Sequence, residues 1–165
     1  NGRFTNLAVD QGFEMPLLVL VMGANFGDLN NDGFLDAYFG TGAPEIDNLM
    51  PNALFLSEGG KNFADVTMAS GMGHLQKGHA IAFVDLDGDG DQDIFEQMGG
   101  AKNVDRFRDA VYANPGFGNH WVDIKVVGTT SNRSGIGARI RVDFLESGVM
   151  RSVHRKVDSG GSFGS

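Results

Sequence analysis

The chain has 165 residues and no cysteine, which excludes disulfides, thiolate metal sites and cysteine nucleophiles. Its 41% hydrophobic content is that of an ordinary globular protein, and its 25 glycines predict many turns between short strands. The net charge is −8, and residues 1–100 hold 15 acidic and only 3 basic residues. We therefore expect no nucleic-acid partner.

A pattern near the N-terminus returns further along the chain. Phe4 and Gly12 have counterparts in Phe63 and Gly71, at one common interval and in segments of similar sequence. The longest apolar run follows, from Met15 to Ala24. It is about half as long as a membrane span and contains a proline, so we interpret it as a buried strand and expect no membrane span.

Two acidic loops carry the clearest chemical signal. Residues 85–93 place a carboxylate at every second position, and residues 28–36 place oxygen-bearing side chains at the same spacing except at Phe34. Unit charges about 4 Å apart repel by about 4 kcal/mol near a protein surface, so such loops favour a bound cation. Calcium accepts six to eight oxygen ligands at about 2.3–2.6 Å, and a glycine at loop position six allows the sharp turn. Gly33 and Gly90 occupy that position.

The two loops therefore predict two calcium ions, with solvated acidic turns as the alternative. Positions 1, 3, 5 and 9 supply side chains and position 7 supplies a carbonyl oxygen. The expected ligands are Asp28, Asn30, Asp32, the carbonyl of Phe34 and Asp36 in the first loop, and Asp85, Asp87, Asp89, the carbonyl of Asp91 and Asp93 in the second.

Short apolar runs flank both loops and predict strands. The runs are rich in β-branched and aromatic residues and are too short for helices. Residues 85–96 also satisfy the EF-hand pattern, with Glu96 at position 12, but glycines at 78, 99 and 100 leave no room for flanking helices. The pattern 52–55 returns at 109–112, at the interval that separates Asp28 from Asp85, which completes an internal repeat. We call this interval the repeat offset.

The loops, with the sequence 39–44 after the first, resemble the FG-GAP/VCBS repeats of integrin-α-like β-propellers. This resemblance implies one calcium ion in a hairpin loop of each blade. Two units and the end of a preceding one cannot close a ring, so we expect unpaired edge strands.

The residues 119–128 and 131–142 are different in kind, because two alternating strand patterns flank a glycine-rich turn. They resemble part of an ASPIC/UnbV domain, as in the cartilage acidic protein family and its bacterial relatives. We therefore divide the chain into repeats over 1–117 and a partial ASPIC/UnbV-like β domain over 118–165. The predicted fold is all-β, with antiparallel propeller-blade-like sheets and a small sandwich-like or barrel-like C-terminal domain.

These features favour a calcium-stabilised, non-catalytic β module for adhesion, protein interaction or assembly. Extracellular calcium would fill weak oxygen sites, so we expect an extracellular, cell-surface or periplasmic location. The expected partner is a protein or glycan at the cell surface, or further copies joined through edge strands into a homo-oligomer or fibre. A glycan-binding module, using the basic C-terminal part, and a hydrolase fragment are the alternatives.

Overall fold

The computed structural model describes residues 2–13, 20–45, 47–100, 102–104 and 107–159. It confirms an all-β architecture of antiparallel sheets, in which the only described helix is the four-residue α1 (Thr67–Ser70). No helix of the described part is long and apolar enough to cross a membrane. The described residues form two compact units, one that ends at His120 and one that begins at Trp121.

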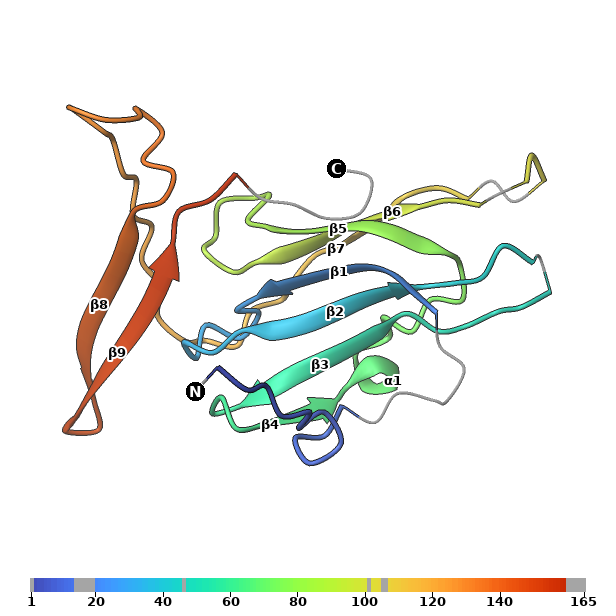
Figure 1. Cartoon of the computed structure of the whole chain (residues 1–165), viewed down its shortest axis with the longest axis horizontal. Coiled ribbons are helices and arrows are strands. Elements are labelled where there is room, and N and C mark those ends of the chain that lie inside the picture. The colour runs from blue at the N-terminus through green and yellow to red at the C-terminus, as the bar shows by residue number, and fades with distance from the viewer. Residues whose placement is uncertain (1, 14–19, 46, 101, 105–106, 160–165) are drawn as a thin grey trace. The chain divides into compact units, whose positions relative to one another are not determined.

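The first sheet has four strands in sequence order. They are β1 (Val21–Gly27), β2 (Asp36–Thr41), β3 (Ala53–Glu58) and β4 (Asn62–Asp65), each antiparallel to its neighbour (Figure 1). The apolar run predicted as a buried strand lies partly in residues 14–19, outside the described residues, and Val21 at the start of β1 is exposed.

The second sheet repeats the first at the repeat offset. It consists of β5 (Gly78–Val84), β6 (Asp93–Met98) and β7 (Ala110–Tyr112) in that order. Adding the offset to the first and last residues of β1 and β2 gives the first and last residues of β5 and β6. Adding it to the first residue of β3 gives the first residue of β7. The periodicity of the sequence is therefore a periodicity of strands, although β4 has no counterpart among the described strands.

The main core lies between these two sheets. Its buried side chains come from β2, β3, β5, β6 and the connecting segments: Leu29, Tyr38, Leu54, Met72, Ile81 and Ile94. Glycines let the backbones approach, because a Cβ atom on Gly23 would lie 1.5 Å from the His79 carbonyl oxygen, and one on Gly78 would lie 2.8 Å from the Gly40 Cα. No larger residue fits either position.

A second apolar cluster covers the opposite face of the first sheet. Ala37, Ala53 and Phe55 are buried there under the rings of Phe13, Phe39 and Phe63. The Phe13 and Phe63 ring centroids are 4.1 Å apart, and the Phe63 N–H donates to the Gln11 carbonyl at 2.7 Å. The N-terminal segment is thus tied to β4.

The second unit contains one hairpin, formed by β8 (Arg139–Glu146) and β9 (Val149–Lys156). Ser147 and Gly148 have φ values of 49° and 81°, as a two-residue hairpin turn requires. Residues 119–128 form no strand, because no described strand pairs with them. The predicted C-terminal domain was sandwich-like or barrel-like, and the described residues form no closed barrel. Among the described residues, the predicted C-terminal β domain contains one two-stranded hairpin.

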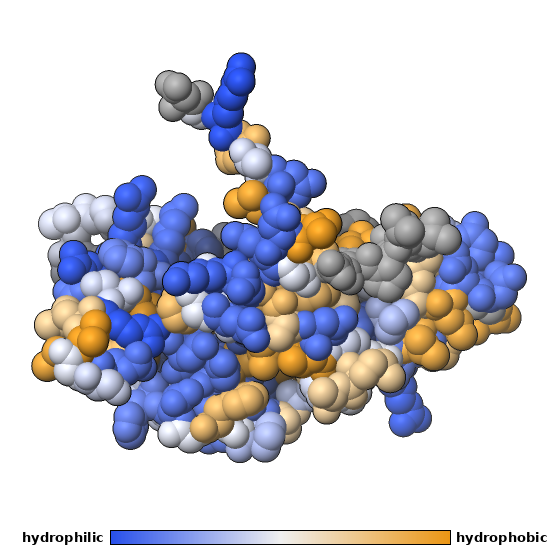
Figure 2. Space-filling model, turned by 90° about the horizontal axis from the view of Figure 1, so that it is seen from below, coloured by the Kyte–Doolittle hydropathy of each residue, from blue (hydrophilic) through white to orange (hydrophobic). Residues whose placement is uncertain are grey.

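Apolar side chains also remain on the surface. Figure 2 shows hydrophobic groups lying between hydrophilic ones across one face of the molecule. The exposed large apolar residues include Phe26, Val111, Trp121 and Val122. Such scattered exposure is normal for a protein surface, and only its local arrangement is informative.

Candidate metal-binding loops

The first loop joins β1 to β2 and is folded around its own carboxylates. The two Asp28 carboxylate oxygens accept the N–H groups of Asp32 and Gly33, each at 3.0 Å. Asp32 accepts the Phe34 N–H at 2.9 Å, and the Asn30 amide donates to Asp32 at 3.2 Å. Gly33 has a φ of 92°, so the glycine at position six adopts the left-handed conformation expected of it.

The second loop joins β5 to β6 in the same manner. The Asp85 carboxylate accepts the N–H groups of Gly88 at 2.7 Å and Gly90 at 3.0 Å. Asp87 accepts the Asp89 N–H at 3.3 Å, and Asp89 accepts the Asp91 N–H at 2.9 Å. Gly90 has a φ of 91°, matching Gly33.

The last aspartate of each loop has a separate structural role. Asp36 accepts the Leu29 N–H at 2.8 Å and the Ser57 N–H at 2.7 Å. Asp93 accepts the corresponding N–H groups of Leu86 at 3.0 Å and Asn114 at 2.8 Å. Both carboxylates are buried and bridge the loop to a residue 21 positions further along the chain. Sequence reasoning assigned these residues as ligands and missed the bridge.

In the first loop, burial is the largest influence on the pKa of the last aspartate, Asp36. It raises the pKa of the Asp36 carboxyl to about 6, against the lowering effect of the Ser57 and Leu29 N–H groups. The neighbouring carboxylates of Asp32 and Asp28 raise the pKa further. A nearby divalent cation would oppose both the burial and the repulsion, because it favours the ionised carboxylate.

The second loop gathers three carboxylates that fit a calcium ion. One oxygen from each of Asp85, Asp87 and Asp89 lies within 4.8 Å of the others, and all three side chains are exposed. Two ligands on opposite sides of calcium are separated by about twice the bond length, roughly 4.6–5.2 Å. The spacing and the all-oxygen donor set therefore suit this ion. Calcium binding at either loop, and the roles of the Phe34 and Asp91 carbonyls, remain predictions.

Polar side chains link the two loops, which sequence reasoning did not foresee. The Asn31 amide donates to the Gly90 carbonyl at 3.1 Å and to the Asp91 carboxylate at 2.7 Å. The Asp28 N–H donates to the Gln92 side chain at 2.8 Å. The Asn114 amide donates to the Leu29 carbonyl at 2.7 Å. The two loops thus lie side by side and act as one structural element.

A buried polar cluster between the sheets was also missed. Glu96 on β6 is fully buried and accepts hydrogen bonds from the Tyr38 hydroxyl at 2.9 Å and the Asn52 amide at 2.7 Å. The Tyr38 hydroxyl also lies 3.0 Å from the Met72 carbonyl. The sequence presented Glu96 only as position 12 of an EF-hand, but strands flank the loop, so that alternative is wrong.

The polar groups of this cluster make the most hydrogen bonds when Glu96 carries a proton. Burial raises the pKa of Glu96 to about 7, although the Tyr38 and Tyr112 hydroxyls lower it. A protonated Glu96 can donate to the Tyr38 oxygen, which frees the Tyr38 hydroxyl to donate to Met72. The Tyr112 hydroxyl is buried near Glu96 without a hydrogen bond of normal geometry among the described residues.

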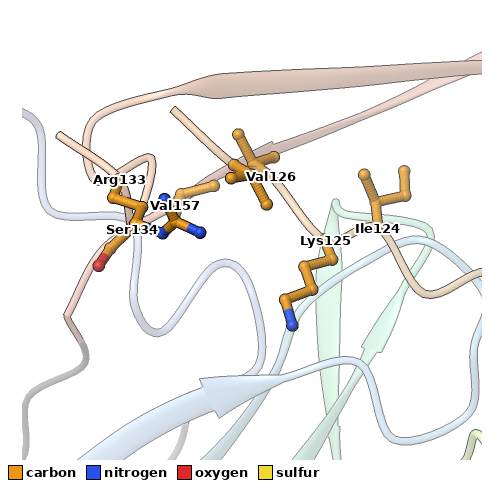
Figure 3. Close-up of a pocket in the computed structure, with 7 residues that line it drawn as sticks. Ile124, Lys125, Val126, Arg133, Ser134 and Val157 are labelled. Atoms are coloured by element: carbon orange, nitrogen blue, oxygen red, sulfur yellow. The ribbon is translucent and has the colours of Figure 1, made fainter. Parts of the chain in front are cut away.

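Hollows lie in both units. One, of about 610 Å³, lies within the first unit between β3 and β7 and is mainly apolar. The other, of about 580 Å³, lies within the second unit and is lined by Lys125, Arg133, Ser134 and neighbouring valines (Figure 3). Its two cationic side chains are the chemistry that a glycan-binding module for anionic sugars requires, and that alternative stays a prediction.

Comparison with known proteins agrees with the interpretation of the repeat region. Residues 28–96 match a family described as FG-GAP-like repeat. The match begins at the first residue of the first loop and ends at Glu96, so it spans both loops, the strands β2 to β5 and the start of β6. No curated protein and no solved structure matches the chain. The resemblance of the C-terminal part to ASPIC/UnbV is outside the matched residues.

FG-GAP-like repeats are typical of integrin-like β modules, which are usually extracellular and serve binding or structure rather than catalysis. Residues 28–96 are therefore similar to an integrin-like, non-catalytic β module.

Proposed function

We propose that the protein is a calcium-stabilised extracellular β module for adhesion or protein interaction, without catalysis. The observation that carries this proposal is the shared scaffold of the two loops. In both, position 1 is held by backbone N–H groups and position 9 is bridged to a residue 21 positions further on. The chain thus builds the same oxygen-rich loop twice.

Calcium would neutralise the loops and pin neighbouring strands. Asp85, Asp87 and Asp89 would hold it in the second loop, and Asp28, Asn30 and Asp32 in the first. Because the loops are joined through Asn31, either ion would also stabilise the contact between the two sheets. At a tenfold excess over its dissociation constant, each ion would add about 1.4 kcal/mol to the free energy of unfolding.

The chain offers a matched pair of substitutions that tests the metal sites. Asp87 and Asn30 occupy position 3 of the two loops, so Asp87→Asn gives the second loop the ligand set of the first, and Asn30→Asp does the reverse. An asparagine at 87 still accepts the Asp89 N–H, so the loop itself is preserved. We expect Asp87→Asn to weaken calcium binding at the second loop and Asn30→Asp to strengthen it at the first.

Calorimetric titration and thermal melting with calcium or chelator measure both effects. Asp47→Asn, an exposed charge outside the loops, serves as the control and should leave calcium binding unchanged. Unchanged melting of the parent protein on chelation would refute the calcium proposal.

A further inference from the structure

The two faces of the β8–β9 hairpin differ in exposure and in chemistry. One face is half-buried and carries the apolar side chains of Ile140, Val142 and Phe144 on β8. On the other face, every side chain of both strands is exposed. The three residue pairs on that exposed face nearest the open end of the hairpin contain no apolar side chain. They are Arg139 with Lys156, Arg141 with His154, and Asp143 with Ser152.

The first two of these pairs bring four basic side chains together. Directly opposed residues on one face have Cβ atoms about 4.5–5.5 Å apart. Successive pairs on the same face are about 7 Å apart along the strand, because each residue advances the chain by about 3.4 Å. We call this group the basic face, and it consists of Arg139, Arg141, His154 and Lys156.

Acidic side chains compensate the basic ones toward the turn of the hairpin but not at its open end. Asp143 forms an ion pair with Arg141 at 2.8 Å, and Glu146 forms one with Arg151. Among the described residues, the side chains of the Arg139 and Lys156 pair have no ion pair. Like charges directly opposite each other destabilise a pair of strands. An anion bound between the two would remove that repulsion.

The chemistry of the exposed face favours an anionic sugar chain over other polyanions. A DNA duplex carries one charge about every 1.7 Å, and a chain with a net charge of −8 would repel it. A protein partner is held mainly by apolar contacts at the centre of the interface, and the three pairs offer none. Sulfate or carboxylate groups on a sugar chain need cations, and sugar hydroxyls need hydrogen-bonding groups such as Ser152 and His154.

We propose that the basic face binds a linear polysaccharide that carries sulfate or carboxylate groups. Arg139 would bind an anionic group through two parallel N–H bonds, and Lys156 would add a second charge beside it. Ser152 and His154 would bind sugar hydroxyls. This inference rests on the proposed role as an interaction module and names its partner, but it uses no residue of the calcium loops.

The test measures binding of the whole chain to heparin, which is sulfated, and to hyaluronan, which is only carboxylated, by calorimetric titration in chelator. The parent protein should bind at least one of them, with an affinity that falls as the salt concentration rises. Arg139→Gln combined with Lys156→Gln should weaken that binding about tenfold. Lys61→Gln combined with Arg108→Gln is the charge-matched control at exposed positions of the first unit, and it should bind like the parent.

Two further variants test the role of charge on the basic face. Arg139→Lys combined with Lys156→Arg keeps both charges and should retain most of the binding. Asp143→Asn removes the acid that pairs with Arg141 but keeps an oxygen that can accept from the Ser152 hydroxyl. It should strengthen binding several-fold, and weaker binding by this variant would contradict the proposal.

Other results would also overturn it. These are a parent protein that binds neither polysaccharide, or an Arg139→Gln, Lys156→Gln variant that binds as tightly as the parent. Tighter binding of polyglutamate or duplex DNA than of both polysaccharides would assign the face to a different class of partner. Binding that needs calcium and survives the double substitution would assign the polysaccharide to the acidic loops.

Two measurements on the same samples separate the possible causes of a lost signal. Circular dichroism of each variant shows that its sheets are intact. Melting with and without calcium tests the calcium proposal by itself, so loss of the calcium effect and loss of polysaccharide binding are distinguished.

Discussion

The buried carboxyl of Glu96 predicts that stability falls as the pH rises. Its pKa is raised from 4.5 to about 7 by burial. A folded-state pKa above the unfolded one means that the folded protein binds the proton more tightly. The stabilisation is therefore complete below about pH 4.5 and is lost as the pH rises through about 7. Since a tenfold change in proton affinity is worth about 1.4 kcal/mol, the loss amounts to about 3 kcal/mol.

Glu96→Gln is the substitution that isolates this effect. Glutamine imitates the protonated side chain: its oxygen can accept from the Asn52 amide, and its amide can donate to the Tyr38 oxygen. We expect the variant to match the parent protein near pH 5 and to be more stable by up to about 3 kcal/mol near pH 8.5.

Urea unfolding at several pH values and constant calcium measures the difference. The pKa of Asp36 is also raised, but Asp36 is present in both proteins, so its contribution to the pH dependence cancels in the comparison. Glu58→Gln, at an exposed position of β3, is the control and should give a difference that is independent of pH. A variant that is less stable than the parent at pH 8.5, or equally different at every pH, would refute this account of Glu96.

Two further predictions concern the same interface. Gly78→Ala should destabilise the protein by more than about 2 kcal/mol in urea unfolding, because the added Cβ would lie 2.0 Å from a Glu96 oxygen and 2.8 Å from the Gly40 Cα; near-parental stability would show that the sheets can separate without cost. Tyr112→Phe should change stability by less than about 1 kcal/mol, since its hydroxyl is buried without a normal hydrogen bond, whereas Tyr38→Phe should cost about 1–3 kcal/mol. Thermal melting of both variants checks the contrast, and an equal loss in the two would contradict it.

The sequence predicted the repeat region well because its signals are local. The conformation of each acidic loop depends on residues within that loop, so the spacing of its aspartates and the position of Gly90 were enough to predict a turn between two strands. The offset between the two loops then predicted that the second sheet would follow the first. The strands β5 and β6 begin and end where that offset places them.

The sequence patterns predicted structure wrongly where a strand needed a neighbouring strand to pair with. The alternating pattern of residues 119–128 is typical of a strand, yet a strand forms only when another strand supplies its hydrogen bonds, and none of the described strands pairs with these residues. For the same reason, the C-terminal domain that was predicted to be sandwich-like or barrel-like contains only one hairpin among the described residues. An alternating pattern of apolar and polar residues shows that the two faces of a segment differ in polarity, but it does not show which segment lies beside it.

By itself, then, the sequence determined the acidic loops, the strands around them and their repetition, because each depends on residues close together in the chain. Only the tertiary structure decided what those residues do at long range. It turned Asp36 and Asp93 into buried bridges, joined the two loops through Asn31, and placed Glu96 beside Tyr38 and Asn52, which are distant from it along the chain. Such contacts depend on how two sheets pack, and packing is a property of the whole fold that no single stretch of sequence encodes.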